Sequence, residues 1–77
     1  IYVDSSSNLY VADSGNNRIQ KFTFGQTIGV TINTGSVILS NPTDVALDKD
    51  EYLFIVDSDN HRIIGSDTNG FRCIAVD

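Results

Sequence analysis

The sequence predicts an all-β fold made of two similar units, and three observations support this prediction. One seven-residue pattern occurs twice in the 77 residues. No window places apolar residues at the i, i+3, i+4 and i+7 positions of an amphipathic helix. Short apolar runs alternate instead with clusters of Asp, Asn, Ser and Gly, which are the residues that turns use.

The repeated pattern is Asp-Ser-Xaa-Asn-Xaa-Arg-Ile, found at Asp13–Ile19 and again at Asp57–Ile63. Without any gap, residues 1–22 align with residues 45–66, and seven of these 22 pairs are identical. Unrelated segments share about one or two identities over this length, and a fixed period of roughly 20 to 50 residues marks solenoids, propellers and arrays. The chain is therefore a repeat protein.

The second unit contains four short runs with the composition of strands, separated by turn residues. They are Thr43–Asp48, Tyr52–Asp57, Arg62–Gly65 and Phe71–Val76. The first unit repeats this order with Ile1–Asp4, Asn8–Asp13, Arg18–Phe24 and Gln26–Ile32. We therefore divide the chain into a first unit at residues 1–32, a connection at 33–41 and a second unit at 42–77.

The second run of each unit is apolar on both of its faces, at Leu9–Ala12 and at Leu53–Val56. Strands of this kind are covered on both sides. Four short antiparallel strands per unit, stacked face to face with copies of themselves, describe the blades of a β-propeller, which closes a ring with about four to eight blades. Two blades form an incomplete propeller with two bare faces, so we expect a longer parent chain, and further blades or other copies to cover those faces.

Composition excludes some classes of partner. The formal net charge is −5, from ten acidic and five basic residues without a run of either sign. Binding to nucleic acid needs clustered Lys and Arg, so no nucleic acid partner is expected. No apolar run approaches the ~18 residues of a membrane span. The one cysteine, Cys73, either fills a strand or pairs with a cysteine outside these residues.

The residues from Leu9 to Phe22 resemble a complete NHL repeat core, and those from Phe54 to Ile63 resemble a second. The stretch Asn41–Asp48 is similar to the Pro-x-Gly-Ile-Ala-Val-Asp opening of such a repeat, with Asp44 in the place of the usual Gly. The resemblance implies a propeller, commonly of six blades, that presents loops to protein, RNA or other ligands. Lyases and lactonases share this architecture, so the fold does not settle the function.

The repeated polar residues are expected to form a structural turn network, with a carboxylate accepting turn amides and a guanidinium bracing it. They are Asp13, Asn16, Arg18, Asp57, Asn60 and Arg62. A catalytic group is needed once per site, whereas these residues occur once per unit. We therefore predict that they hold each hairpin together.

Positions that differ between the units are better candidates for a ligand-facing loop: Asn17, Asp59 and His61. A lone His without a second ligand is a weak metal candidate, and Asp57–Asn60 lacks the central Gly and distal Glu of a calcium loop. No nucleophile elbow or phosphate-binding Gly loop is present. The sequence predicts no catalytic residue, metal or cofactor.

The favoured hypothesis is a non-enzymatic scaffold that binds protein or another ligand through a loop face, in an extracellular location, with a cytoplasmic one as the alternative. A second hypothesis is a propeller enzyme of the lyase or lactonase type, with a metal on the central axis near Asp4, Asp44 or Asp48. A third is an open or fibrous assembly of units that do not close into a ring.

Overall fold

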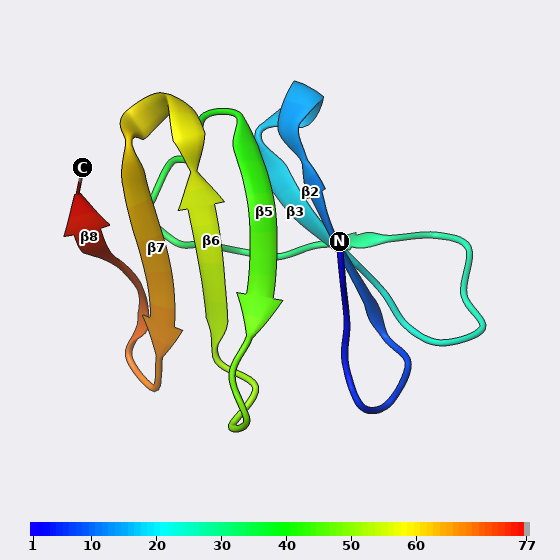
Figure 1. Cartoon of the computed structure of the whole chain (residues 1–77). Helices are drawn as coiled ribbons and strands as arrows, with labels where there is room; N and C mark the ends of the chain where they lie inside the picture. Colours follow the sequence, from blue (N-terminus) through cyan, green and yellow to red (C-terminus); the bar gives the residue numbers. More distant parts are fainter. Residues whose placement is uncertain (77) are drawn as a thin grey trace.

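A computed structural model describes residues 1–76 and contains two four-stranded antiparallel sheets (Figure 1). The first sheet consists of β1 (Tyr2–Val3), β2 (Leu9–Asp13), β3 (Arg18–Phe22) and β4 (Val30–Thr31). The second sheet consists of β5 (Pro42–Leu47), β6 (Leu53–Asp57), β7 (Arg62–Asp67) and β8 (Gly70–Val76). In both sheets the strands lie in chain order, so the predicted all-β architecture of four-stranded antiparallel blades is confirmed. No helix in this part of the chain has the length and apolarity to cross a bilayer.

Every strand differs from its predicted bounds by at least one residue, and two of these differences have a clear local cause. The run Gln26–Ile32 forms a strand only at Val30–Thr31. Gln26 still belongs to the preceding turn, where its N–H donates to the Thr23 carbonyl at 2.8 Å, and residues 27–29 lie outside any strand. Gly25 adopts φ +84° in this turn, a conformation that glycine adopts without strain. In the second sheet, β7 extends two residues beyond the predicted Gly65, because Ser66 and Asp67 pair with Phe71 and Gly70 across a tight hairpin.

Each repeated Asp-Ser segment forms one 3₁₀ turn between two antiparallel strands. The turns are η1 (Ser14–Asn16) and η2 (Ser58–Asn60), and each leads directly from one strand to its hydrogen-bonded neighbour. Asn17 and His61 follow with φ of 54° and 52°, in the left-handed region where Asn and His are more frequent than most residues. The turns reverse the chain, so they support the hairpins and do not replace any strand.

The two sheets pack against each other through one apolar face of each. Figure 1 shows β5 beside β2 and β3, and β2 and β5 are in close contact. The first sheet contributes Tyr10 and Ile19 to the buried core, and the second sheet contributes Val45, Leu53, Ile55 and Ile64. Leu39, from the connection between the sheets, completes this core. We call the two packed faces the inner faces.

Within residues 1–76 no other sheet packs on the opposite faces of the two sheets, and we call them the outer faces. On the first sheet the outer face carries Val3, Leu9, Val11 and Phe22, and on the second sheet it carries Phe54, Val56, Ile63 and Ile74. Strand alternation turns Tyr10 inward and Val11 outward, and turns Ile55 inward and Phe54 outward. Ile55 is 0 % exposed and Phe54 is 36 % exposed, so neighbouring apolar residues of one strand have different environments.

Replacing Ile55 by Ala should lower the free energy of unfolding by about 2–5 kcal/mol, because a cavity is left in a fully buried site. Replacing Val56, which is 37 % exposed on the outer face, by Ala should lower the free energy of unfolding by less than about 1 kcal/mol. Urea denaturation followed by circular dichroism at low protein concentration measures both values. Equal losses for the two variants would contradict the one-sided packing.

Candidate functional site

The second Asp-Ser hairpin is organised around the carboxylate of Asp57, whose side chain is 0 % exposed. Arg62 Nε donates to Asp57 Oδ2 at 2.7 Å, and Asn60 Nδ2 donates to the same oxygen at 2.9 Å. The backbone N–H of Ser40 donates to Asp57 Oδ1 at 2.7 Å. Both oxygens of the buried carboxylate therefore have donors, as burial of a charge requires.

The first hairpin repeats the same arrangement. Arg18 Nε donates to Asp13 Oδ2 at 2.8 Å, and Asn16 Nδ2 donates to it at 3.0 Å. The structure thus brings together all six residues of the predicted turn network, three in each hairpin. The five-residue spacing of Asp and Arg places them opposite each other at the ends of paired strands, since Asp13 pairs with Arg18 and Asp57 with Arg62.

The two hairpins differ in what they hold outside the hairpin. Arg62 Nη2 donates to the Ile38 carbonyl at 2.8 Å. Asp57 and Arg62 therefore bind the connection between the sheets through two backbone groups, the Ser40 N–H and the Ile38 carbonyl. Within residues 1–76, no segment makes these contacts with Asp13 and Arg18. The Asp13 side chain accordingly remains 29 % exposed. The sequence match did not reveal this difference, because it lies in the connection.

Two of the three candidate loop residues also contact the connection. Asn17 Oδ1 accepts a hydrogen bond from the Asn41 N–H at 2.8 Å. The Asp59 N–H donates to the Ser40 carbonyl at 3.1 Å, and the Asp59 carboxylate accepts 3.4 Å hydrogen bonds from the Ser40 hydroxyl and the Asn41 side-chain amide. Ser40 and Asn41, which sequence reasoning did not select, are therefore held from both sheets. The only sequence feature that could have indicated this contact is the position of these two polar residues between Leu39 and Pro42.

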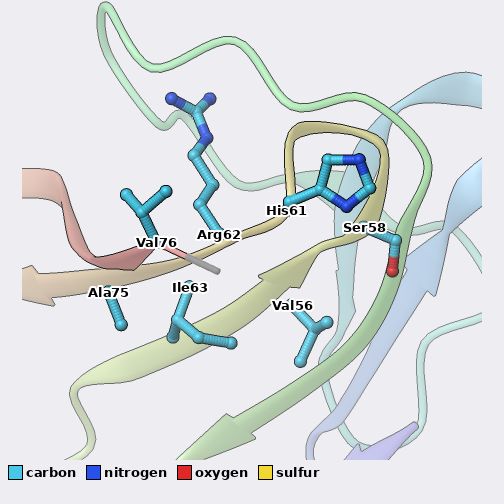
Figure 2. Close-up of a pocket in the computed structure, with 7 residues that line it drawn as sticks. All are labelled: Val56, Ser58, His61, Arg62, Ile63, Ala75 and Val76. Carbon is cyan, nitrogen blue, oxygen red and sulfur yellow. The ribbon is translucent and has the colours of Figure 1, made fainter.

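The third candidate, His61, is exposed and lines an open hollow of about 400 Å³ on the outer side of the second sheet. Figure 2 shows His61, Arg62 and Ser58 around its rim, with Val56 and Ile63 on the adjacent strands. Ala75 and Val76 of β8 complete the lining. The hollow is thus apolar along the sheet and polar at the hairpin, a combination that suits an amphipathic ligand.

The aspartates considered for a metal on the ring axis have other partners. Asp4 Oδ1 accepts the N–H groups of Ser6 and Asn8, both at 2.9 Å. Asp48 Oδ1 accepts those of Asp50 and Tyr52 at 2.8 and 3.0 Å, which is the same turn in the second unit. Asp44 Oδ1 accepts the N–H of Val45. Over residues 1–76, no three His, Cys, Asp or Glu side chains form a metal-binding group.

Hydrogen bonding lowers the pKa of the aspartate carboxylate in both hairpins. Burial by itself raises the pKa of Asp57, but the bonds from Asn60, Ser40 and Arg62 outweigh it, and the net pKa is lowered. The hydrogen bond from Arg18 lowers the pKa of Asp13, with help from Asn16. The backbone N–H of Asn8 lowers the pKa of Asp4. All three side chains favour the ionised form in the folded chain.

Replacing Asp57 by Ala should lower the free energy of unfolding by about 3 kcal/mol, because Arg62 and the Ser40 N–H lose a buried partner. The matched control is Asp13→Ala, which removes the same side chain from an exposed hairpin and should cost clearly less. Urea denaturation of the two variants gives the comparison. If Asp13→Ala were as destabilising as Asp57→Ala, the hydrogen bond between Asp57 and the connection would contribute nothing to stability.

Stability should fall on acidification below about pH 4, because these folded-state pKa values lie below the ordinary aspartate value of about 3.9. The unfolded chain then binds protons before the folded chain does. The stabilisation is fully present above pH 4 and is lost as the pH falls through the lowered pKa values. Urea denaturation between pH 7 and pH 2 tests this, and Asp57→Asn should show a shallower decline. An identical decline in that variant would remove Asp57 from the explanation.

The family model described as NHL repeat matches residues 1–22 and 39–65, which is more than half of the chain. No curated protein matches the chain significantly. The matched stretches include β1, β2, β3, β5 and β6, together with both polar hairpins. The resemblance drawn from the sequence is thereby confirmed, and the four-stranded antiparallel sheets agree with it. This chain belongs to the NHL repeat family and forms β-propeller-like repeat units.

Proposed function

We propose that this chain is a non-enzymatic binding scaffold, and that its ligand is an extended peptide segment of a partner protein. The ligand site is the hollow of the second sheet, with His61 on the rim and Val56 and Ile63 along the sheet. An extracellular location remains part of this proposal, and its support is the scarcity of Lys beside abundant Ser, Asn and Thr.

The observation that carries the proposal is the occupied counterpart of this hollow on the first sheet. At the 44-residue offset, Val56, Ser58, His61 and Ile63 correspond to Ala12, Ser14, Asn17 and Ile19. There the extended connection and β5 cover the sheet, and Ile19 is fully buried. Asn17 Oδ1 accepts the N–H of Asn41, the residue before Pro42. An extended peptide is therefore the kind of group that this position of the repeat accommodates.

His61 would supply the hydrogen-bond acceptor for a peptide N–H that Asn17 supplies in the first unit. A neutral imidazole has one nitrogen that accepts an N–H and another that donates, so it can replace the Asn side chain against a peptide backbone. The apolar lining of Val56, Ile63 and Val76 offers contact area to an aliphatic residue of the ligand. An Asn-Pro segment preceded by aliphatic residues combines both requirements.

The other polar groups of the hairpins support a structural role in place of catalysis. Asp13 and Asp57 are both bonded to the Arg and Asn of their own hairpin. In residues 1–76, every buried side-chain nitrogen or oxygen has a hydrogen-bond partner. Asp4 and Asp48 cap their own turns. These contacts favour a scaffold over the metal-dependent enzyme.

The test is a titration with a synthetic peptide of residues 36–43, Ser-Val-Ile-Leu-Ser-Asn-Pro-Thr, followed by NMR. Resonances of Val56, His61 and Ile63 should shift, with a dissociation constant on the order of 1 mM or lower. The variant His61→Ala should weaken binding about three- to tenfold, which is the effect of one lost hydrogen bond. Thr68→Ala, in the exposed turn after β7, is the matched control and should bind normally.

A second peptide carries an N-methyl group on the Asn residue, which removes the N–H that the imidazole would accept. It should bind more weakly than the unmodified peptide by a similar factor. Unchanged binding of His61→Ala, or shifts confined to Asn17 and the connection, would refute the proposed site. The second pattern would show that the peptide only competes with the chain's own connection.

A further inference from the structure

Asn69 is the one asparagine of the sequence that precedes a glycine, and it lies in the turn between β7 and β8. An asparagine side chain loses ammonia when the backbone nitrogen of the next residue attacks its amide carbon, which makes asparagine a chemically labile residue. Glycine favours this attack, because it has no Cβ to obstruct the approach and its backbone adopts more conformations. Among the asparagines of the sequence, the attack is therefore least hindered at Asn69.

The side chain of Asn69 also differs from those of the other asparagines in its contacts. Within residues 1–76, six asparagines each make a hydrogen bond through the side-chain amide: Asn8, Asn16, Asn17, Asn33, Asn41 and Asn60. In the same residues the Asn69 side chain makes none, and only its backbone N–H donates, to Asp67 Oδ1 at 2.7 Å. The amide carbon of Asn69 can therefore turn toward the nitrogen of Gly70 without breaking a side-chain hydrogen bond.

The turn around Asn69 is open to water and lies at the end of a ladder. Asn69 and Gly70 are exposed and line an open hollow of about 330 Å³ beside the connection between the sheets. No atom lies within 4 Å of the place where a Cβ of Gly70 would stand. Within residues 1–76, β8 is an edge strand, and the pair of Asp67 with Gly70 is the last of its ladder. Such an end opens at little cost in free energy, which releases the Gly70 nitrogen for attack.

We propose that Asn69 is a site of spontaneous deamidation in the folded chain, with water as the co-reactant. The Gly70 nitrogen bonds to the side-chain amide carbon of Asn69, its proton passes through solvent to the departing NH₂ group, and ammonia leaves. The product is a cyclic succinimide. Water then adds to one of the two ring carbonyl carbons and breaks its bond to the Gly70 nitrogen. Opening at the side-chain carbon gives aspartate, and opening at the backbone carbon gives isoaspartate.

Both products disturb the hairpin. Aspartate at position 69 adds one negative charge to a chain whose formal net charge is −5, and places it beside the carboxylate of Asp67. Isoaspartate carries the main chain through one additional carbon, so the turn between Asp67 and Gly70 no longer has the length that the paired strands require. The modification therefore loosens the hairpin next to Phe71, which packs against the core.

The test is incubation of the folded chain in mildly alkaline buffer made with heavy-oxygen water, followed by peptide mass spectrometry. Asn69 should exchange its amide nitrogen for labelled oxygen about tenfold faster than any other asparagine of the chain. The modified chain is then separated by ion exchange. Its backbone amides at Gly70 and Phe71 should exchange hydrogen faster than those of the unmodified chain, because the end of the ladder is loosened.

Two variants separate the effect of the glycine from the effect of the structure. Asn69→Gln retains an amide, but its longer side chain would have to close a larger ring, so the reaction at this position should stop. Thr34→Gly gives Asn33 a glycine neighbour, while the Asn33 side chain accepts the Gly35 N–H at 2.9 Å. Asn33 in this variant should react more slowly than Asn69 in the folded chain, and at a similar rate in urea. NMR spectra verify that both variants retain the fold.

Three results would overturn the inference. Labelling of Asn69 in urea but not in the folded chain would show that the paired hairpin protects the amide. Equal labelling of all asparagines in the folded chain, or faster labelling of Asn33 than of Asn69 in Thr34→Gly, would show that the contacts of the side chain do not select the site. Unchanged hydrogen exchange in the modified chain would show that the hairpin is not loosened.

Discussion

A buried carboxylate must be surrounded by donors, and this requirement at Asp57 fixes how the two sheets are joined. Its donors come from three segments: the η2 turn, strand β7 and the connection. Moving any of these segments would remove a donor from a charge in a site that water does not reach. The connection is therefore held at its backbone, through Ser40 and Ile38, and its side chains are free to serve other purposes such as the packing of Leu39.

The inner faces supply most of the apolar burial, and the hairpins supply orientation. Stacking of short strands with two apolar faces permits many relative positions, since apolar contact has little directional preference. The polar contacts of Asn17, Asp59 and Asp57 with Ser40 and Asn41 select one position. Because apolar strands supply burial and polar turns supply orientation, the family pattern repeats both. It also explains why the residues of the pattern are poor candidates for catalysis.

The proposed binding function depends on positions that depart from the pattern. Asn17 and His61 occupy equivalent places, with the same left-handed backbone, but only Asn17 has a segment of the described chain against it. The hollow beside His61 and the open faces at Val11 and Phe54 follow from the same geometry.

The sequence by itself determined the repeat, the antiparallel hairpins and the pairing of Asp13 with Arg18 and of Asp57 with Arg62, because these depend on neighbours within a few residues. It did not determine the shortening of the fourth strand at Val30–Thr31, where Gly29 passes close to the ring of Phe22. The tertiary structure alone decided that Asp57 is buried and Asp13 is not, because burial depends on whether a distant segment crosses the hairpin. Two hairpins with the same Asp, Asn and Arg differ in burial for that reason, and no local pattern encodes the crossing.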